Sequence, residues 1–393
     1  MKSILIKNGN AIICGKVAKR DILIVGSKIS DVDFSGEVPK DAEVIDGTDK
    51  YVSPGFVDIH LHGGGGYDFM DATKEAFKKI SDIHLMNGTT TMLPTTVTAP
   101  ISDIIKVIKT YKECIDDCPN FYGIHLEGPY ISKQQKGAHK AELIHNPCKE
   151  ETELLIKEGK SVIKRITAAP ELCGMDRFVR AMKDYGVLFS IGHSDATSDI
   201  ALGAMEKGFS HVTHLYSATP TIRKINEVIK AGVMEAAYLN EDVSVELIGD
   251  SKHVAVDALK LAVKVKGIDK VALVTDALRC AGECVKESYL GEKIPKNRII
   301  IEDGVAKLPD RSSFAGSIAT SSMLLEKGVN HYGLSVEDVV TMLTKTPARI
   351  IGAKNKGELA AGFDADIVIF DKNYAVKEVI LAGKLVKGEK RYV

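Results

Sequence analysis

The sequence has almost no net charge, and this absence excludes a general affinity for polyanions. Its 393 residues include 52 basic and 53 acidic side chains, which leaves a formal net charge of −1 at neutral pH. The overall field of such a protein attracts neither nucleic acid nor an anionic membrane surface. An anionic ligand therefore has to be bound by a local site.

The N-terminal region also lacks a long hydrophobic run. Within residues 1–21 a very short apolar run is followed closely by charged residues, so we expect neither a signal peptide nor a membrane span there. With 45% hydrophobic and 27% charged residues, the composition is typical of a soluble globular protein. We therefore expect a cytoplasmic protein whose partners include no membrane and no nucleic acid.

Cysteines are few and have no regular spacing. Seven cysteines at scattered positions do not make a disulfide framework in a chain of this length. Two pairs lie four residues apart, Cys114 with Cys118 and Cys280 with Cys284. The first pair is predicted to be buried on a helix and the turn after it. The second pair follows a candidate active-site strand, and the sequence leaves open whether it has a metal or redox role.

Eight apolar stretches alternate with amphipathic helical stretches in the middle of the chain. The predicted strands are residues 56–62, 90–96, 121–128, 162–170, 187–194, 211–217, 243–251 and 271–277. Several of the helical stretches end at a glycine, which is a common C-terminal stop. Eight strand–helix units over this length predict an α/β fold of the TIM-barrel type, with its active site at the C-terminal ends of the strands.

The two ends of the chain have a different pattern. Residues 1–52 and the last forty residues consist of short apolar runs separated by turns. We predict that both termini pair into one small β-domain, so that the segments are 1–52, a barrel over 53–351, and 352–393. A hairpin over 290–308 and three helices reaching Ile351 are predicted between the eighth strand and the C-terminal segment. No internal repeat or long linker interrupts this organisation.

Six side chains that can bind a metal or transfer a proton lie at the C-terminal ends of predicted strands. They are His60, His62, Glu127, His193, His214 and Asp276. A single histidine on an apolar strand is usually a hydrogen-bonded core residue, but six such groups at one rim are not explained by packing. Buried charges are costly unless they are paired or bound to a cation, so the cluster predicts a divalent metal site. Nitrogen and oxygen donors suit Zn²⁺, Fe²⁺, Mn²⁺ or Co²⁺ without choosing among them.

Together these motifs resemble the amidohydrolase superfamily, and within it the N-acetylglucosamine-6-phosphate deacetylase family. The matching segments are SPGFVDIHLHG, HLEGP, GHSDA, THLY, VTDA and GELAAGFDADIVIFD, in the family's order over nearly the whole chain. The resemblance implies a TIM barrel flanked by a β-sandwich built from both termini. It also implies a homodimer and a metal-dependent hydrolysis of an N-acetylhexosamine 6-phosphate to the amino sugar phosphate and acetate.

The resemblance also implies which residues bind the metal. Glu127, His193 and His214 resemble the ligands of a principal metal, and His60 and His62 resemble those of a second site that some members have. One or two ions are implied, with Zn²⁺ or Fe²⁺ first among the choices. Other amidohydrolases bridge their metals with a carbamylated lysine at the end of strand four. Here ITAAP occupies that end, which favours a site bridged by glutamate.

The resemblance gives Asp276 the role of acid and base. Its carboxylate would accept a proton from the attacking water and return that proton to the departing amine. The alternative reading of Asp276 is a cap for the helix-like segment DALRCAG. The five ligand-type residues at the same rim favour the catalytic reading.

Further residues are implied to contact the substrate. They are His139 at the reacting carbonyl, His253 at the phosphate, Ser217 and Ala218 in a backbone cradle for the sugar phosphate, and Phe314 in the pocket wall. The chain departs from the family at 217–225, where HLYSAT replaces HLYNAM and the REPG arginine of the family has no aligned counterpart. Arg223 is the nearest candidate for that arginine and Lys224 the next.

Two other functions stay open from the sequence. One is an amidohydrolase that acts on a different N-acyl or cyclic amide, which the altered region 217–225 favours. The other is a sugar-phosphate-binding barrel without catalysis, and the six filled ligand and acid–base positions argue against it.

Overall fold

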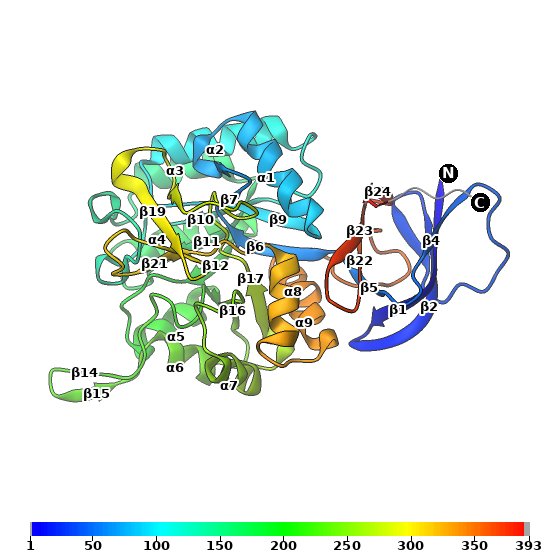
Figure 1. The fold of residues 1–393 in the computed structure, drawn as a ribbon. Coiled ribbons are helices and arrows are strands. Elements are labelled where there is room, and N and C mark those ends of the chain that lie inside the picture. Colours follow the sequence, from blue (N-terminus) through cyan, green and yellow to red (C-terminus); the bar gives the residue numbers. More distant parts are fainter. Residues whose placement is uncertain (1, 389–393) are drawn as a thin grey trace.

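The computed structural model describes residues 2–388, and a barrel of parallel strands lies at their centre (Figure 1). In hydrogen-bonded order its strands are β6 (Phe56–Leu61), β9 (Thr89–Thr96), β10 (Ile124–Glu127), β11 (Ile163–Ala168), β12 (Leu188–Ile191), β13 (Phe209–Val212), β16 (Ser244–Ile248) and β17 (Val271–Val274). A bridge between Leu61 and Ala277 brings the first strand beside the end of the last, so the barrel is nearly closed. The predicted TIM barrel is confirmed.

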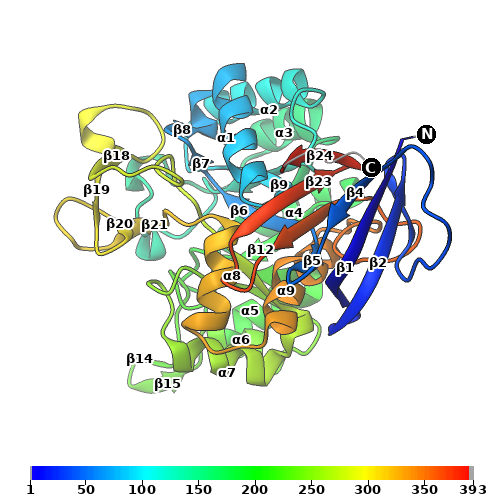
Figure 2. The same cartoon turned by 45° about the vertical axis from the view of Figure 1, so that its right-hand side comes forward.

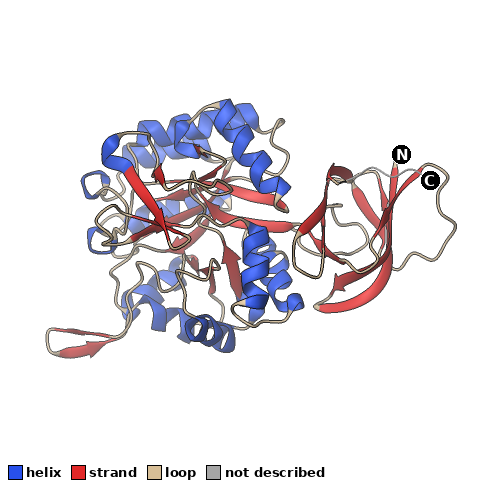
Figure 3. Cartoon of the chain, viewed as in Figure 1, coloured by secondary structure: helices blue, strands red, loops and turns tan. Residues whose placement is uncertain are grey.

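A helix follows each barrel strand and packs on the outside of the barrel (Figure 3). These helices are α1 (Lys74–Met86), α2 (Ile101–Cys114), α3 (Lys149–Gly159), α4 (Met175–Met182), α5 (Ser198–Lys207), α6 (Val233–Leu239), α7 (Val256–Lys266) and α8 (Ser321–Asn330). In α2, the buried residues Ile104, Ile108 and Tyr111 recur every three or four positions and form one apolar face. Helices α9 (Val336–Leu343) and α10 (Lys345–Ile350) contact β6 and β17. Three helices therefore follow the eighth strand, as the sequence predicts.

Apart from β9, the barrel strands end earlier than predicted. Strands β12, β13 and β17 end at Ile191, Val212 and Val274, two residues before His193, His214 and Asp276. Each of these three site residues has a positive φ, of 47°, 27° and 47°. Extended backbone cannot continue through such a conformation, so the strand stops and the side chain turns toward the barrel axis.

Both termini contribute to a second sheet beside the barrel (Figures 1 and 2). Its strands are β1 (Ser3–Ile13), β2 (Lys16–Val25), β3 (Lys28–Asp31), β4 (Ala42–Asp46), β5 (Tyr51–Pro54), β22 (Ile367–Phe370), β23 (Val376–Leu381) and β24 (Lys384–Lys387). The N-terminal β5 pairs with the C-terminal β22, Ser53 opposite Val368. A register shift between Ile6 and Gly9 lets β1 pair with β4 and then with β5, so the sheet curves around its own apolar core.

The predicted union of the two termini in one β layer is therefore confirmed. The domain boundaries after residues 52 and 351 stay predictions, and residues 1 and 389–393 lie outside the described part of the chain. Within the described residues, no helix is long and apolar enough to cross a membrane.

Two smaller elements extend from the C-terminal rim of the barrel. The predicted hairpin over 290–308 is part of a four-stranded antiparallel sheet, here called the rim sheet, with strands β18 (Glu287–Tyr289), β19 (Arg298–Glu302), β20 (Val305–Lys307) and β21 (Phe314–Gly316). A bridge from Ala277 to Ser317 fixes it beside the end of β17. The hairpin β14 (Arg223–Ile225) and β15 (Val228–Lys230) projects away from the barrel (Figure 1). A short pair, β7 (Gly63–Gly64) and β8 (Tyr67–Asp68), follows β6.

Candidate active site

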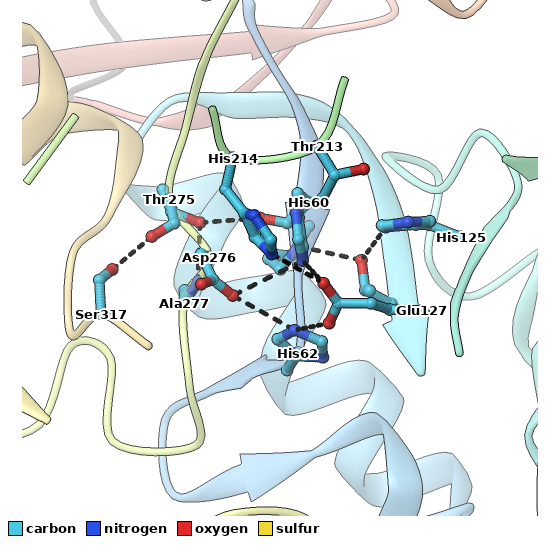
Figure 4. A network of polar contacts seen from close by, with 12 residues as sticks. His60, His62, His125, Glu127, Thr213, His214, Thr275, Asp276, Ala277 and Ser317 are labelled. Carbon is cyan, nitrogen blue, oxygen red and sulfur yellow. Dashed lines mark hydrogen bonds and ion pairs between the residues drawn. The ribbon is translucent and has the colours of Figure 1, made fainter. Parts of the chain in front are cut away.

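Glu127 lies at the centre of a cluster of imidazole rings at the C-terminal rim (Figure 4). It is the last residue of β10, and only 2% of it is exposed. Its Oε1 lies 3.4 Å from His60 Nε2, 3.3 Å from His193 Nε2 and 3.2 Å from His214 Nε2. Three histidines from three strand ends therefore converge on one carboxylate oxygen.

The other oxygen of Glu127 faces two more histidines. Its Oε2 lies 3.2 Å from His62 Nε2 and 3.5 Å from His139 Nε2. Asp276 lies on the same side, with Oδ1 at 3.2 Å from His62 Nε2 and 3.6 Å from His60 Nε2 (Figure 4). The structure thus brings together all six residues that the sequence places in the metal and acid–base set.

In His193 and His60, the hydrogen bond at the nitrogen that faces away from Glu127 determines the tautomer of the ring. His193 Nδ1 lies 2.8 Å from Gln135 O, and His60 Nδ1 lies 2.7 Å from Glu246 Oε1. Both partners only accept, so each Nδ1 carries a hydrogen, and Nε2 is the nitrogen that faces Glu127, where it can hold either a proton or a metal ion. His60 Nε2 has no hydrogen-bond partner among the described residues.

His139 has the opposite arrangement. Its Nδ1 lies 3.3 Å from the backbone nitrogen of Thr98, which is a donor. His139 Nδ1 therefore accepts, and its Nε2 carries the hydrogen and faces Glu127. A ring in this state donates a hydrogen bond into the site, which suits contact with a carbonyl oxygen better than metal binding.

These residues fit a divalent metal. The ligand atoms of His60, His62 and Glu127 all lie within 4.8 Å of one another, and so do those of Glu127, His139 and His193. His193 Nε2 and His214 Nε2 are 3.1 Å apart, which is close for two nitrogens unless a proton or a cation lies between them. Imidazole and carboxylate donors without thiolate are the set expected for the metals named from the sequence.

The charges of the cluster also favour a cation. Burial alone would lower the pKa of His62, but hydrogen bonds and charge from Asp276 and Glu127 outweigh it and raise that pKa to about 9. Burial would raise the pKa of Glu127, yet the charge of His60 and the bonds from the other rings hold it well below the usual range. Burial would also raise the pKa of Asp276, but the charge of His60 and the bond from His62 lower it. Glu127 and Asp276 are therefore both ionised, and their negative charge stabilises a positive group between them.

A buried ion pair between Arg165 and Glu246, inside the barrel, holds two residues of the cluster in place. It was not predicted from the sequence. Glu246 on β16 accepts from His60 Nδ1 and, at 3.2 Å, from the backbone nitrogen of His214, both through Oε1. Its Oε2 lies 2.5 Å from Nη1 of Arg165, which is fully buried and also bonds Thr213. The available signal was a charged residue inside each of two apolar strands, VELIG and RITA.

A cavity of about 220 Å³ opens beside the cluster. The predicted substrate residues that line it are His139, Ser217, Ala218, His253 and Phe314. The His253 and Phe314 rings lie 4.9 Å apart, and His253 Nδ1 lies 2.7 Å from Asp250 Oδ2. Phe314 comes from the rim sheet, so this sheet forms one wall of the cavity.

Arg223 is not brought to this cavity. It lies on β14, where its Nη1 is 2.7 Å from Asp195 Oδ1 and its Nη2 is 2.6 Å from Asp195 O. Its positive charge is therefore paired within the same chain. Cys280 is buried and Cys284 is exposed, and neither belongs to a metal-type cluster found among the described residues.

Comparisons with known proteins agree with one another. The family model described as "Amidohydrolase family" matches residues 51–386. The chain is 32% identical to the N-acetylglucosamine-6-phosphate deacetylase of Lysinibacillus sphaericus, over 87% of each chain. It is 30% identical to the N-acetylgalactosamine-6-phosphate deacetylase of Shewanella sp. (strain ANA-3), over 84% of this chain and 82% of the relative.

A solved structure with the same architecture covers nearly the whole chain. The N-acetyl-D-glucosamine-6-phosphate deacetylase of Mycobacterium smegmatis, in a mutant form in complex with N-acetyl-D-glucosamine-6-phosphate, superimposes with a TM-score of 0.90 at 28% identity. The match covers 98% of this chain and 100% of that one. The likeness therefore includes the terminal sheet as well as the barrel.

Proposed function

Because this chain belongs to the amidohydrolase family, we propose that it hydrolyses the acetamide of N-acetylglucosamine 6-phosphate or a close N-acetylhexosamine 6-phosphate. The products are the amino sugar phosphate and acetate. The observation that carries the proposal is the ionised Glu127, within 3.5 Å of five imidazole nitrogens and beside Asp276, at the edge of a cavity. A binding protein without catalysis has no need for this arrangement.

The proposed cofactor is Zn²⁺ or Fe²⁺, in one or two copies. Glu127, His193 and His214 would hold the first ion, and His60 and His62 with Glu127 would hold the second. When bound, a metal of this kind lowers the pKa of a water molecule from about 16 toward 7 and polarises the amide carbonyl.

Asp276 is proposed to move the proton. Its carboxylate is buried, ionised and held by the bond from its backbone nitrogen to His60 O, 2.9 Å long. It accepts a proton from the attacking water and delivers it to the amide nitrogen as the carbon–nitrogen bond breaks. His139 Nε2–H donates to the carbonyl oxygen, where negative charge develops.

The sugar phosphate is proposed to lie along the part of the cavity formed by Ser217, Ala218 and His253. Asp250 fixes His253 through the 2.7 Å contact at Nδ1. Both glucosamine and galactosamine deacetylases occur among the relatives, so the epimer that this enzyme prefers is a matter for measurement.

We also propose a homodimer that forms through the projecting hairpin. Ile222, Val228 and Ile229 on and beside this hairpin are 56%, 55% and 66% exposed. Large apolar side chains grouped on a projecting element are typical of an interaction surface. The cytoplasmic location expected from the sequence stays a prediction.

Acetate release from four compounds tests the proposed reaction. The substrates are N-acetylglucosamine 6-phosphate, its galactosamine epimer and the two unphosphorylated sugars. We expect one or both phosphorylated sugars to be hydrolysed and the unphosphorylated ones to be poor substrates. Equal rates with and without the phosphate would contradict the proposed substrate class and favour another N-acyl amide.

The Asp276→Asn variant tests the site. It keeps the shape of the side chain but removes the proton acceptor, so we expect a rate loss of at least about 10²-fold with bound metal and nearly normal substrate binding. Metal content and substrate affinity are measured alongside the rate. Full activity of the variant would remove Asp276 from the mechanism.

A further inference from the structure

A second and larger cavity adjoins the active-site cavity. It measures about 640 Å³, against about 220 Å³ for the active-site cavity. The two cavities share four lining residues, which are Val97, Ala138, His139 and Leu290. Its size is that of a ligand-binding pocket, whereas the methyl group of an acetamide needs only a small fraction of this space.

The position of this cavity relates it to one part of the substrate. It is lined by the segments that follow β8, β9 and β10 and by the rim sheet. The proposed sugar-phosphate residues Ser217 and His253 follow β13 and β16 instead, and neither lines the larger cavity. The two cavities therefore extend to different sides of the metal cluster.

The orientation of the bound amide determines that the acyl chain of the substrate points toward the larger cavity. The reacting carbonyl carbon has to lie beside Glu127 and Asp276, and the amide nitrogen has to point toward the sugar. The acyl chain leaves the carbonyl carbon on the side opposite to that nitrogen. It therefore points past His139 and Val97, which line both cavities.

One part of the lining has the apolar chemistry that an acyl chain requires, while charged side chains such as Asp103, Lys106 and Lys296 line the rest of the cavity. Val97, Leu143, Leu290 and Leu308 all face the cavity, and all are only partly buried. Ala99, which is 8% exposed, adds another apolar surface between Val97 and helix α2. Apolar side chains left partly exposed inside a concave site gain free energy when hydrocarbon covers them.

We propose that this larger cavity is an acyl-group subsite, and that the enzyme hydrolyses N-acyl hexosamine 6-phosphates with chains longer than acetyl. The inference rests on the proposed function and deepens it. The reaction is the same hydrolysis: the water oxygen bonds to the acyl carbon, the carbon–nitrogen bond breaks, and the water proton goes to the amine through Asp276. The products are the amino sugar phosphate and the carboxylate of the corresponding unbranched fatty acid.

The test is a series of N-acyl glucosamine 6-phosphates with acetyl, butanoyl and hexanoyl groups. We expect kcat/KM for the longer amides to stay within about tenfold of the acetyl value, since a site without room for added methylenes discriminates about 10–200-fold for each one. A decrease of more than about a hundredfold from acetyl to butanoyl would overturn the proposal.

Two variants test whether the acyl chain of the substrate lies in the larger cavity. Leu143→Trp and Leu308→Trp each fill part of the larger cavity from a different element, and neither residue lines the active-site cavity. In each variant we expect butanoyl and hexanoyl hydrolysis to fall at least about tenfold more than acetyl hydrolysis. Leu239→Trp, at a position that is 70% exposed on α6, is the matched control. It should leave the ratio of long-chain to acetyl hydrolysis unchanged.

Each remaining outcome is decisive. Undiminished hydrolysis of the long amides in both filled variants would mean that the acyl chain lies elsewhere, and would overturn the assignment. Absence of acetyl hydrolysis in the wild type would count against the proposed function itself, which separates the two failures.

Discussion

Glu246 connects the buried interior of the barrel to two of the proposed metal ligands. One carboxylate oxygen accepts from His60 Nδ1 and from the backbone nitrogen of His214, and the other accepts from Arg165 Nη1. It therefore holds the His60 ring in the state that presents Nε2 to the cluster, and it also stabilises the positive φ of His214. Glu246 acts through other residues and is a positioning residue.

The Glu246→Gln variant should weaken metal binding. A glutamine must turn its NH₂ group either toward the donors of His60 and His214 or toward Arg165, so at least one donor loses its acceptor in either orientation. We expect metal affinity to fall about 10–100-fold, as is typical when a partner of a metal ligand is lost. We also expect a loss of stability on the order of 3–5 kcal/mol, because Arg165 loses its counter-ion in the interior.

A matched control separates the two effects. Asp366 is also a buried carboxylate that accepts from a cation and a backbone nitrogen, Lys356 Nζ at 2.6 Å and Ala382 N at 2.9 Å, but it lies directly before β22 and away from the metal cluster. Asp366→Asn should lower the unfolding midpoint and leave metal affinity, measured by chelator competition, unchanged. Equal metal affinity in Glu246→Gln and the wild type would show that Glu246 has only a structural role.

The sequence predicts which residues belong to the site when their side chains stand at strand ends. It does not predict which of them pair with residues on distant strands. His60, Glu127 and Asp276 follow apolar runs, and parallel strands bring such ends to one rim. The pairing of Arg165 with Glu246 depends on which strands face each other across the barrel, and periodicity does not contain that information. The same limit applies to Arg223, whose pairing with Asp195 was not predicted.

Helix α1 is joined to the strand end that carries His62 by a buried histidine. His84 Nε2 lies 2.9 Å from Gly63 O and therefore donates to it, while His84 Nδ1 has no partner among the described residues. Burial outweighs this hydrogen bond and lowers the pKa of His84 from 6.5 to about 4. The ring is consequently almost entirely neutral in the folded protein at neutral pH.

This contact should make folding stability depend on pH. The folded-state pKa lies below the unfolded value, so the contribution is complete above pH 6.5 and is lost as the pH falls toward 4. Near pH 5 the loss amounts to about 2 kcal/mol. His84→Gln keeps a donor for Gly63 O but does not titrate, so we expect the stability advantage of the wild type to shrink by that amount between neutral pH and about pH 5.

Urea unfolding of the two proteins at both pH values measures this difference. Other buried histidines, such as His125 and His211, also have lowered pKa values, but they are present in both proteins and cancel in the comparison. Parallel pH dependences of the wild type and His84→Gln would mean that His84 is free to be protonated in the folded state.

At the level of elements, the strands were predictable and the rim sheet was not. Each barrel strand overlaps the stretch that predicts it, and every residue of β6, β9, β10, β16 and β17 is buried. The rim sheet is built from short strands with exposed positions, such as Glu287 and Phe314, so its sequence predicts a hairpin with turns. Its placement over the site depends on a bridge from Ala277 to Ser317, which is a tertiary contact.

In the molecule as a whole, the hairpin of β14 and β15 projects from the barrel without pairing to another sheet among the described residues. The hairpin of β14 and β15 has only its two strands, paired from Arg223 with Lys230 to Ile225 with Val228. A two-stranded hairpin alone is at best marginally stable in water, and this one exposes Val228 and Ile229 to 55% and 66%. A second copy of the chain that covers the hairpin would remove this apolar surface from water, which is the physical basis of the proposed homodimer.

Light scattering after size exclusion tests this interface. We expect the wild type to be a dimer, and a Val228→Asp, Ile229→Asp double variant to be a monomer, because two carboxylates would have to be buried without partners. Val38→Asp places the same charge on a residue that is 43% exposed in the terminal β region and should stay dimeric. A monomeric wild type, or a double variant that remains dimeric, would exclude the hairpin as the dimer contact. Arg223 belongs to the same hairpin, so loss of phosphate selectivity in the monomeric variant would place a phosphate contact across the interface.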